Sequence, residues 1–207
     1  PYFQHFKDKY PDVHALADAS EDMIMKSWEG LGYYSRARNL HTAARYVAYE
    51  LEGRFPHTYE GILQLKGVGP YTAAAIASFA YDLPYAVLDG NVFRVLSRYF
   101  GDASPIDSTA GKKRFRQLAQ QLLEENTAPP SAHNQAMMDF GATRCTPRNP
   151  SCSTCPLQVK CQAFQSEKVD ALPVKTKKIK KTNRYFQYLV IRQAGKVLLH
   201  KRTDKDI

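Results

Sequence analysis

Long apolar runs are missing from this chain. None of its 207 residues belongs to a run that approaches the roughly eighteen consecutive apolar side chains of a membrane-spanning helix. Residues 1–25 also lack the basic stretch followed by an apolar stretch that is typical of a secretory leader. We therefore expect no contact with a membrane and no secreted, disulfide-bonded domain.

Acidic residues are also few. The chain has 20 Asp and Glu against 29 Lys and Arg, which gives a formal net charge of +9. A surplus of this sign favours a polyanionic partner, because basic side chains that neutralise phosphates release counterions. Many basic proteins bind no nucleic acid, so charge alone does not identify the partner. The apolar fraction of 43% is enough for the core of one domain, or of one domain and part of another.

Cysteine is scarce, and the four that occur lie close together in the sequence. They are Cys145, Cys152, Cys155 and Cys161, spaced Cys-x6-Cys-x2-Cys-x5-Cys. Four thiolates can bind a 4Fe-4S cluster or a zinc ion, or can form two disulfides. Structural zinc sites usually use two Cys-x2-Cys pairs, whereas only one is present, and disulfides would suit a secreted protein. The spacing predicts a 4Fe-4S cluster held by residues 145–161.

Helical periodicity dominates from residue 12 to 164, and a β signal is absent there. Start and stop residues predict helices in the following order: 12–18, 20–30, 33–51, 58–65, 70–81, 91–100, 108–125 and 131–140.

A helix-hairpin-helix is predicted at residues 65–72, Leu-Lys-Gly-Val-Gly-Pro-Tyr-Thr. Gly67 and Gly69 permit a tight turn with exposed backbone amides, Val68 can pack between the two helices, and Lys66 adds a positive charge. The amides and the positive end of the second helix would bind a DNA phosphate without reading a base. A tight turn without a ligand is the alternative.

Asp89 follows a short apolar run and precedes the predicted helix 91–100. In the simplest interpretation it caps that helix, with its carboxylate accepting a backbone N–H. A carboxylate placed after a phosphate-binding hairpin could also face a bound nucleotide, and one side chain could serve both purposes.

The hairpin, the Asp at a helix start and the cysteine spacing together resemble the iron-sulfur branch of the helix-hairpin-helix DNA glycosylases. Three segments resemble the A/G-specific adenine DNA glycosylases within it: Trp-Glu-Gly-Leu-Gly-Tyr-Tyr-Ser-Arg-Ala-Arg-Asn-Leu at 28–40, Leu-Asp-Gly-Asn-Val at 88–92 and Asn-Gln-Ala-Met-Met-Asp at 134–139. The resemblance implies a mainly α glycosylase fold over residues 1–165 that includes the 4Fe-4S loop at 145–161. A basic linker at 166–184 and the truncated start of a Nudix-like α/β domain at 185–207 follow.

The resemblance also implies roles for individual residues. Asp89 would stabilise the positive charge that develops on the sugar as the base leaves, with Tyr71 and Asn91 lining the sugar and the attacking water. Leu31 and Tyr33 would fill the gap that the extruded adenine leaves, with Tyr33 inserted beside the opposing 8-oxoguanine. Tyr33 could instead be an aromatic side chain packed where two helices meet.

Arg36 would hold a phosphate or lie on a solvated helix face. The expected DNA contacts are Leu31, Tyr33 and Arg36 together with the hairpin residues Lys66, Gly67, Val68 and Gly69.

Tyr71 occupies the position where the endonuclease III pattern has a Schiff-base lysine. Because a phenol cannot form an imine, we expect hydrolysis of the glycosidic bond without strand cleavage. The expected function is base excision from double-stranded DNA with A:8-oxoguanine or A:G mispairs, by a monomer in the bacterial cytoplasm that associates with the nucleoid through DNA. An endonuclease III-like bifunctional glycosylase and lyase, or a non-catalytic iron-sulfur DNA-binding module, are the alternatives.

The proton donor of the resembling family is a Glu in a helix that precedes the Pro-Tyr-Phe segment with which this sequence opens. We expect the chain as given to be an internal fragment that lacks this acid and has little or no activity by itself. At the other end, Lys and Arg side chains over 174–184 predict a solvated linker, and residues 185–192 and 197–201 predict a β-hairpin.

Overall fold

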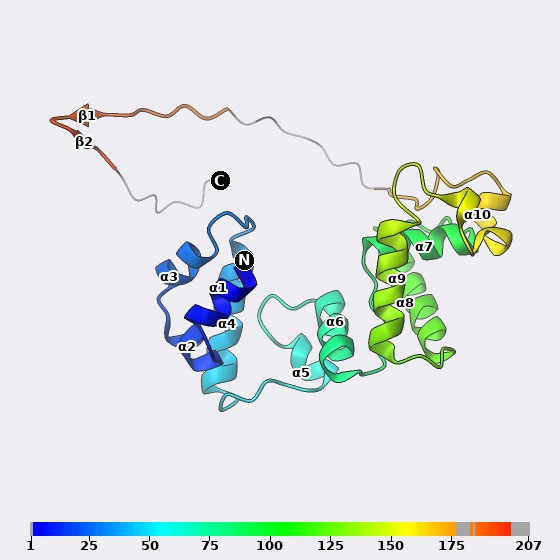
Figure 1. The fold of residues 1–207 in the computed structure, drawn as a ribbon, viewed down its shortest axis with the longest axis horizontal. Helices are drawn as coiled ribbons and strands as arrows, with labels where there is room; N and C mark the ends of the chain where they lie inside the picture. The colour runs from blue at the N-terminus through cyan, green and yellow to red at the C-terminus, as the bar shows by residue number, and fades with distance from the viewer. Residues whose placement is uncertain (1, 177–182, 184, 200–207) are drawn as a thin grey trace. The chain divides into compact units, whose positions relative to one another are not determined.

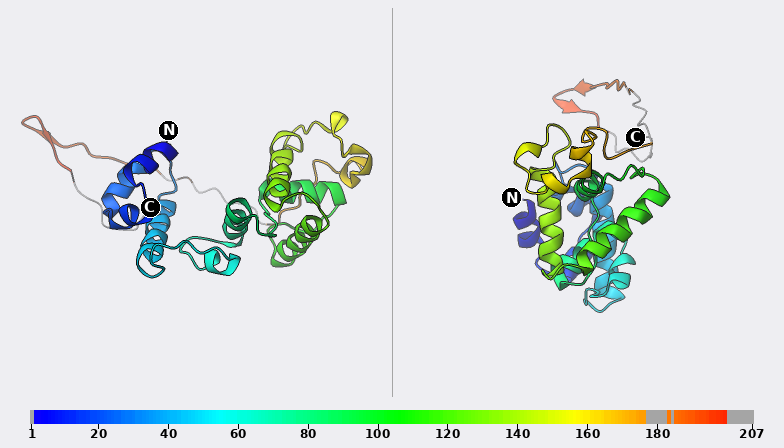
Figure 2. Two further views of the ribbon diagram at one scale, coloured as in Figure 1. Left: turned by 60° about the horizontal axis from the view of Figure 1, so that its bottom comes forward. Right: turned by 90° about the vertical axis from the view of Figure 1, so that its right-hand side faces the viewer.

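A computed structural model describes residues 2–176, 183 and 185–199 of the chain. It divides into two compact units, Pro1–Thr176 and Lys177–Ile207. Figures 1 and 2 show that the first unit is helical. Its α-helices are α1 (Tyr2–Lys9), α2 (Val13–Asp18), α3 (Glu21–Ser27), α4 (Ser35–Tyr49), α5 (Tyr59–Leu63), α6 (Pro70–Tyr81), α7 (Gly90–Phe100), α8 (Thr109–Glu124), α9 (Pro130–Thr143) and α10 (Gln162–Gln165).

Side-chain caps fix the starts of several helices, as the sequence predicts. The hydroxyls of Ser20, Thr58 and Ser108 accept the backbone N–H three residues further on, at the first turns of α3, α5 and α8. Asp12 does the same for α2. Each cap satisfies a backbone donor that a helix start leaves unpaired, so these starts are encoded locally.

The first helix, α1, is missing from the sequence-based prediction. It has no side-chain cap to signal its start, and its stability comes from packing. Phe6 lies 5.8 Å from the Trp28 ring and 5.4 Å from the Tyr10 ring, measured between centroids. The spacing of Phe6 and Tyr10, four residues apart, places both rings on one helix face, and this was the available signal.

Two predicted helices were longer than the helices that form. The predicted helix 20–30 ends at Ser27, because Gly30 adopts a φ of +91° that a right-handed helix does not allow. The predicted helix 33–51 covers only Ser35–Tyr49, since Tyr33 and Glu52 have φ values of +47° and +53°. A left-handed residue on either side sets both ends of α4.

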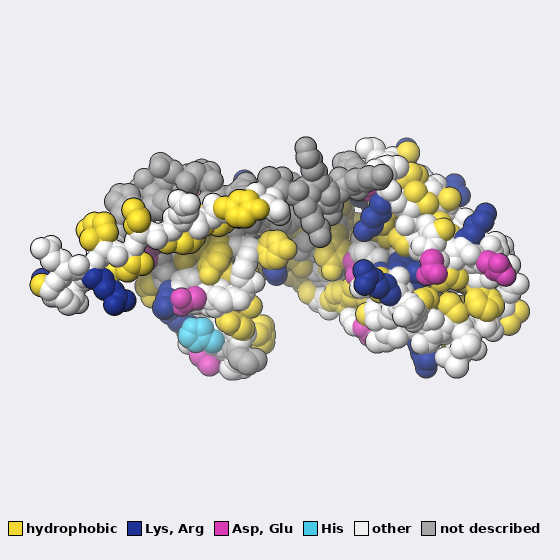
Figure 3. All heavy atoms as spheres, turned by 90° about the horizontal axis from the view of Figure 1, so that it is seen from above, with side chains coloured by type: hydrophobic (Ala, Val, Ile, Leu, Met, Phe, Trp, Pro, Cys, Tyr) yellow, Lys and Arg dark blue, Asp and Glu magenta, His cyan; other side chains and the backbone are white. Residues whose placement is uncertain are grey.

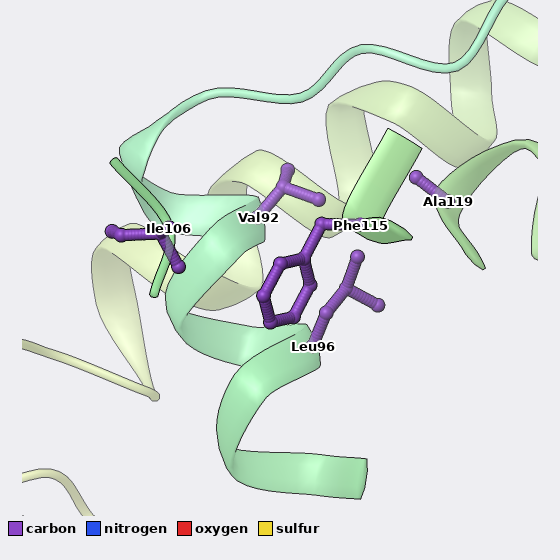
Figure 4. Close-up of a cluster of buried hydrophobic side chains, with 5 residues drawn as sticks. All are labelled: Val92, Leu96, Ile106, Phe115 and Ala119. Carbon is purple, nitrogen blue, oxygen red and sulfur yellow. The ribbon is translucent and has the colours of Figure 1, made fainter. Parts of the chain in front are cut away.

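Among the described residues, three clusters of buried apolar side chains form the core. One joins Tyr10, Ile24 and Ala37, and a second joins Ile62, Ala73 and Ala77 of α5 and α6. Figure 4 shows the third, in which the ring of Phe115 from α8 lies among the side chains of Val92, Leu96, Ile106 and Ala119. This cluster joins α7 to α8 and thereby supports the helix that begins at Asp89.

Within the described ranges, none of the helices is both long and apolar enough to cross a membrane. On the face seen in Figure 3, Lys and Arg side chains are scattered among acidic and apolar ones. The described Lys and Arg side chains on this face therefore form no single continuous basic surface.

The second unit contains a short antiparallel hairpin, β1 (Arg192–Gln193) and β2 (Lys196–Val197). The turn between the strands uses Ala194 and Gly195, both with positive φ. The predicted strands were longer, at 185–192 and 197–201. Side chains in the preceding stretch are largely exposed, with Leu189 at 92%, so within the described residues no buried core supports longer strands. The predicted linker residues Lys177, Lys178, Lys180, Lys181 and Arg184 and the end of the second predicted strand lie outside the described residues.

Candidate nucleic-acid and catalytic site

The hairpin between α5 and α6 has the predicted geometry. Gly67 adopts a φ of +80°, which favours glycine. Val68 packs against Ile62, Ala73 and Ala77, and its N–H donates to the Leu65 carbonyl at 3.1 Å. Gly69 is the N-cap residue of α6 and contributes no side-chain cap. The first amides of α6 are therefore left for another acceptor, at the positive end of the helix.

The two hairpin glycines provide a matched pair of substitutions. A Cβ at Gly67 would lie 2.5 Å from the Asn39 Cβ and would require a strained φ, whereas a Cβ at Gly69 meets nothing within 4 Å. We expect Gly67→Ala to lower the free energy of unfolding by about 1–3 kcal/mol.

Gly69→Ala should leave unfolding unchanged and weaken binding to duplex DNA, because its methyl group would occupy the space beside the amides. Chemical denaturation and salt-dependent DNA titrations measure the two effects. Unchanged DNA affinity in Gly69→Ala would contradict the proposal that this turn binds a DNA phosphate.

Asp89 caps α7, as its position before the helix predicts. Its Oδ1 accepts the backbone N–H groups of Asn91 and Val92, both at 2.8 Å, and its Oδ2 accepts from Asn91 Nδ2 at 2.8 Å. The side chain is half-buried. Three donors and the helix dipole favour a negative charge at this point and hold the carboxylate in one orientation.

Asn91 is fixed on both sides of its amide. Its Nδ2 donates to Asp89, and its Oδ1 accepts from Arg94 Nη2 at 2.9 Å. The backbone of Gly141 in α9 lies against it, since a Cβ on Gly141 would come within 2.7 Å of the Asn91 Cβ. Close approach of α9 to the start of α7 therefore requires glycine at 141.

Arg94 links this helix start to the cysteine segment. Its side chain is buried, its Nε donates to the Cys145 carbonyl at 2.6 Å, and its Nη2 also donates to the Gly141 carbonyl. Burial lowers the pKa of the Arg94 guanidinium from its ordinary value, and Arg98 nearby acts in the same direction. A continuous set of hydrogen bonds therefore runs from Asp89 through Asn91 and Arg94 to Cys145.

Arg98, one turn further along α7, holds the cysteine segment at a second point. Its Nη1 donates to the Thr146 carbonyl at 2.7 Å and lies 3.5 Å from Cys145 Sγ. Its Nε donates to the Val169 carbonyl at 2.9 Å. Sequence reasoning missed both Arg94 and Arg98, although two arginines four residues apart on an otherwise apolar helix face were the available signal.

The four cysteines surround one pocket. All are free and half-buried, and they line it with apolar neighbours that include Val95, Tyr99, Phe140, Leu157 and Val169. Burial raises the pKa of the Cys152 thiol, and the other three cysteines raise it further. In the described part of the chain, no three ligand-type side chains converge closely enough to hold a single metal ion. All four cysteines nevertheless line this one pocket, and none of them is in a disulfide in the structure, in contrast to the disulfides considered as an alternative.

The turn before α4 carries the other predicted DNA contacts. Tyr33 is 81% exposed and therefore does not pack where two helices meet, and Leu31 is partly exposed beside it. Trp28 Nε1 donates to the Gly32 carbonyl at 2.9 Å, and the guanidinium of Arg36 lies 5.6 Å from the Trp28 ring centroid. The hydrogen bond from Trp28 holds the turn in place, and the exposed Tyr33 side chain projects from the turn.

Tyr71, in the first turn of α6, is 48% exposed and lines a pocket of about 340 Å³. Leu88, Phe93, Lys112 and Arg116 contribute to the same wall, whereas Asp89 and Asn91 do not. The structure thus places Tyr71 close to the chain that leads into Asp89, without bringing the Tyr71 and Asp89 side chains into one pocket. Lys66 is exposed at the hairpin.

Comparison with known proteins supports the helix-hairpin-helix glycosylase fold. Residues 1–125 match the family described as HhH-GPD superfamily base excision DNA repair protein. The mouse adenine DNA glycosylase is 47% identical over 79% of this chain and 32% of its own length, and that of Buchnera aphidicola is 34% identical over the whole chain and 59% of its own length. The solved structure of a thermostable thymine-DNA glycosylase aligns with a TM-score of 0.72 at 31% identity, over 80% of this chain and 75% of that one.

The chain spans between about a third and three fifths of the length of these curated relatives.

Proposed function

The chain belongs to the HhH-GPD superfamily of base excision DNA repair proteins, and on this basis we propose that it forms part of a monofunctional adenine DNA glycosylase. The proposed substrate is duplex DNA with adenine opposite 8-oxoguanine or guanine, and the proposed acting species is a monomer. The observation that carries the proposal is the carboxylate of Asp89, which three donors orient at a helix start beside a helix-hairpin-helix. The similarity to adenine DNA glycosylases supports it.

In the proposed reaction, the glycosidic bond breaks with positive charge developing on the sugar. Asp89 lies beneath that charge and stabilises it electrostatically, while Asn91 holds the carboxylate and the attacking water in place. Because the Asp89 oxygens are already oriented by N–H groups, they need no rearrangement as the charge develops. Tyr71 borders the sugar and cannot form an imine, so the reaction stops at the abasic site.

DNA contacts are proposed at two turns. Lys66, Gly67, Val68 and Gly69 would bind a backbone phosphate through the amides at the start of α6. Leu31 and Tyr33 would fill the space left by the extruded adenine, and Arg36 would bind a nearby phosphate. The exposure of Tyr33 supports this role, since an exposed ring is free to enter a duplex.

We propose that Cys145, Cys152, Cys155 and Cys161 hold a 4Fe-4S cluster. Four free thiols on one pocket supply the four ligands such a cluster takes, and Arg98 contributes compensating positive charge beside Cys145. When bound, the cluster would fix the fold of residues 145–161, and Arg94 and Arg98 would connect that fold to α7. No step of the proposed base release passes through it.

The full-length protein is the material for testing activity, because the chain spans only part of the length of the curated relatives. We expect single-turnover release of adenine from an A:8-oxoguanine duplex, and borohydride should trap no covalent adduct with DNA. An endonuclease III assayed beside it provides the positive control for trapping.

Each contrary result identifies a different alternative. A trapped adduct would indicate the bifunctional glycosylase and lyase. Salt-dependent DNA binding with no base released would indicate a DNA-binding module.

A further inference from the structure

The segment that leads into Asp89 is held in an unusual way. Residues 83–88 belong to no helix and no strand. Most of these residues are buried or half-buried, so their backbone N–H and C=O groups require partners. Two side-chain amides, one from α9 and one from α8, supply partners for four of these groups.

Asn134 of α9 is the deeper of the two. It is 1% exposed, and its Oδ1 accepts the N–H of Val87, itself 2% exposed, at 2.9 Å. Its Nδ2 donates to the Tyr85 carbonyl at 2.9 Å and to Ser78 Oγ at 2.8 Å. One buried carboxamide therefore bonds to two backbone groups two residues apart, as a neighbouring β-strand would, and joins them to α6.

Gln120 of α8 repeats the arrangement one residue earlier. Its Oε1 accepts the N–H of Ala86 at 3.0 Å, and its Nε2 donates to the Pro84 carbonyl at 2.8 Å. The two carboxamides thus bond to the backbone of four consecutive residues, 84–87, and fix the path of the segment there.

Rigid anchoring at Val87 has a direct consequence for Asp89, which is two residues further on. The direction of Val87 and Leu88 sets where the Asp89 carboxylate enters the site. The same helix that carries Asn134 also presents Gly141 against Asn91. Helix α9 therefore defines the chain on both sides of Asp89.

We propose that Asn134 is a positioning residue for the carboxylate of Asp89, with Gln120 as the weaker second anchor. The proposal rests on the proposed function, because its kinetic consequence is a loss of base release. Asn134 is buried and has all its hydrogen bonds within the protein, so it acts through the backbone of Val87 and does not touch DNA.

The first test uses the full-length protein with Asn134→Ala and Gln120→Met. A displacement of about 1 Å at a reacting group costs on the order of 10²-fold in rate. We expect Asn134→Ala to lower the single-turnover rate of adenine release by about 10²-fold and Gln120→Met by about 10-fold. The control is Ser97→Ala, which removes another buried hydrogen bond, from Ser97 Oγ to the Asp102 carbonyl at 2.7 Å, and should change the rate by less than about 2-fold.

Two duplexes separate positioning from general weakening. One carries a cationic pyrrolidine in place of the reacting sugar and requires the carboxylate; the other carries an uncleavable 2′-fluoro adenosine and does not. Asn134→Ala should weaken binding of the pyrrolidine duplex by the same factor as the rate while leaving the fluoro duplex unchanged. Equal weakening of both duplexes, or unchanged binding of both, would overturn the proposal.

A second measurement does not depend on activity. Hydrogen exchange of the Asn91 and Val92 amides, which Asp89 caps, should be faster in Asn134→Ala and Gln120→Met and unchanged in Ser97→Ala. If the unsubstituted protein releases no adenine, the proposed function fails, and exchange still decides whether Asn134 positions Asp89. If Asn134→Ala does not fold, the proposal is decided by Gln120→Met, because Gln120 is half-exposed. Exchange of the Asn91 and Val92 amides as slow in Gln120→Met as in the unsubstituted protein would contradict the proposal.

Discussion

Asp89→Asn should lower the single-turnover rate of adenine release from the full-length protein by about 10³-fold or more. The substitution removes the negative charge that is proposed to stabilise the developing positive charge on the sugar. It keeps the shape of the side chain, and Asn is as good a helix N-cap as Asp. With its single oxygen, Asn keeps the two backbone caps and loses the bond from Asn91 Nδ2. The folded structure and the affinity for an uncleavable duplex should therefore remain, and the chemical step should fail.

The matched control is Asp12→Asn. Asp12 caps α2 in the same manner, with its Oδ1 accepting the Ala15 N–H at 2.8 Å, and it lies outside the proposed site. Base release should be unchanged in this variant. Quenched-flow measurement of released adenine compares the two, and an Asp89→Asn enzyme as active as Asp12→Asn would show that this carboxylate does not take part in the reaction.

Arg94→Met should give the largest loss of stability among single substitutions at the site. The Gly141 carbonyl would lose a donor in a buried position, and the Cys145 carbonyl and the Oδ1 of Asn91 would each lose one in a partly buried position. An unsatisfied buried acceptor costs about 1–3 kcal/mol, so we expect the free energy of unfolding to fall by about 3 kcal/mol or more. Removing the buried charge of Arg94 offsets part of this loss of stability, but the carbonyls that it binds remain without a donor.

Arg94→Met should also reduce the iron retained per protein after anaerobic purification, since the cysteine segment would lose an anchor at Cys145. Arg45→Met is the control, because Arg45 is exposed and its guanidinium only lies over the Tyr49 ring, 5.8 Å from its centroid. Guanidinium denaturation and iron analysis measure the two effects. Wild-type stability together with full iron content in Arg94→Met would contradict the proposed anchoring role.

Local chemistry explains what could be predicted from the sequence. Ser20, Thr58, Ser108 and Asp89 cap helices through bonds to residues two or three positions away, so a short window of sequence contains all the information. The same holds for the helix-hairpin-helix, where two glycines and a proline determine the turn. These features were predicted and are observed.

Contacts between distant residues explain what was missed. Helix α1 depends on the packing of Phe6 against Trp28, and the role of Arg94 depends on a carbonyl 51 residues away. Asn134 was noticed only as part of a motif, because the backbone groups that it binds lie 47 and 49 residues earlier. No local pattern encodes such partners, and only the folded chain brings them together.

One helix, α7, carries the capped Asp89 at its start and both arginine anchors within its length. A residue inserted between positions 91 and 98 would rotate everything beyond it by about 100° and shift it by about 1.5 Å. The guanidinium groups would then face the Phe115 cluster instead of the cysteine segment. In-frame insertions or deletions should therefore be excluded from α7 during the evolution of this protein, whereas the exposed stretch 126–129 between α8 and α9 can change in length.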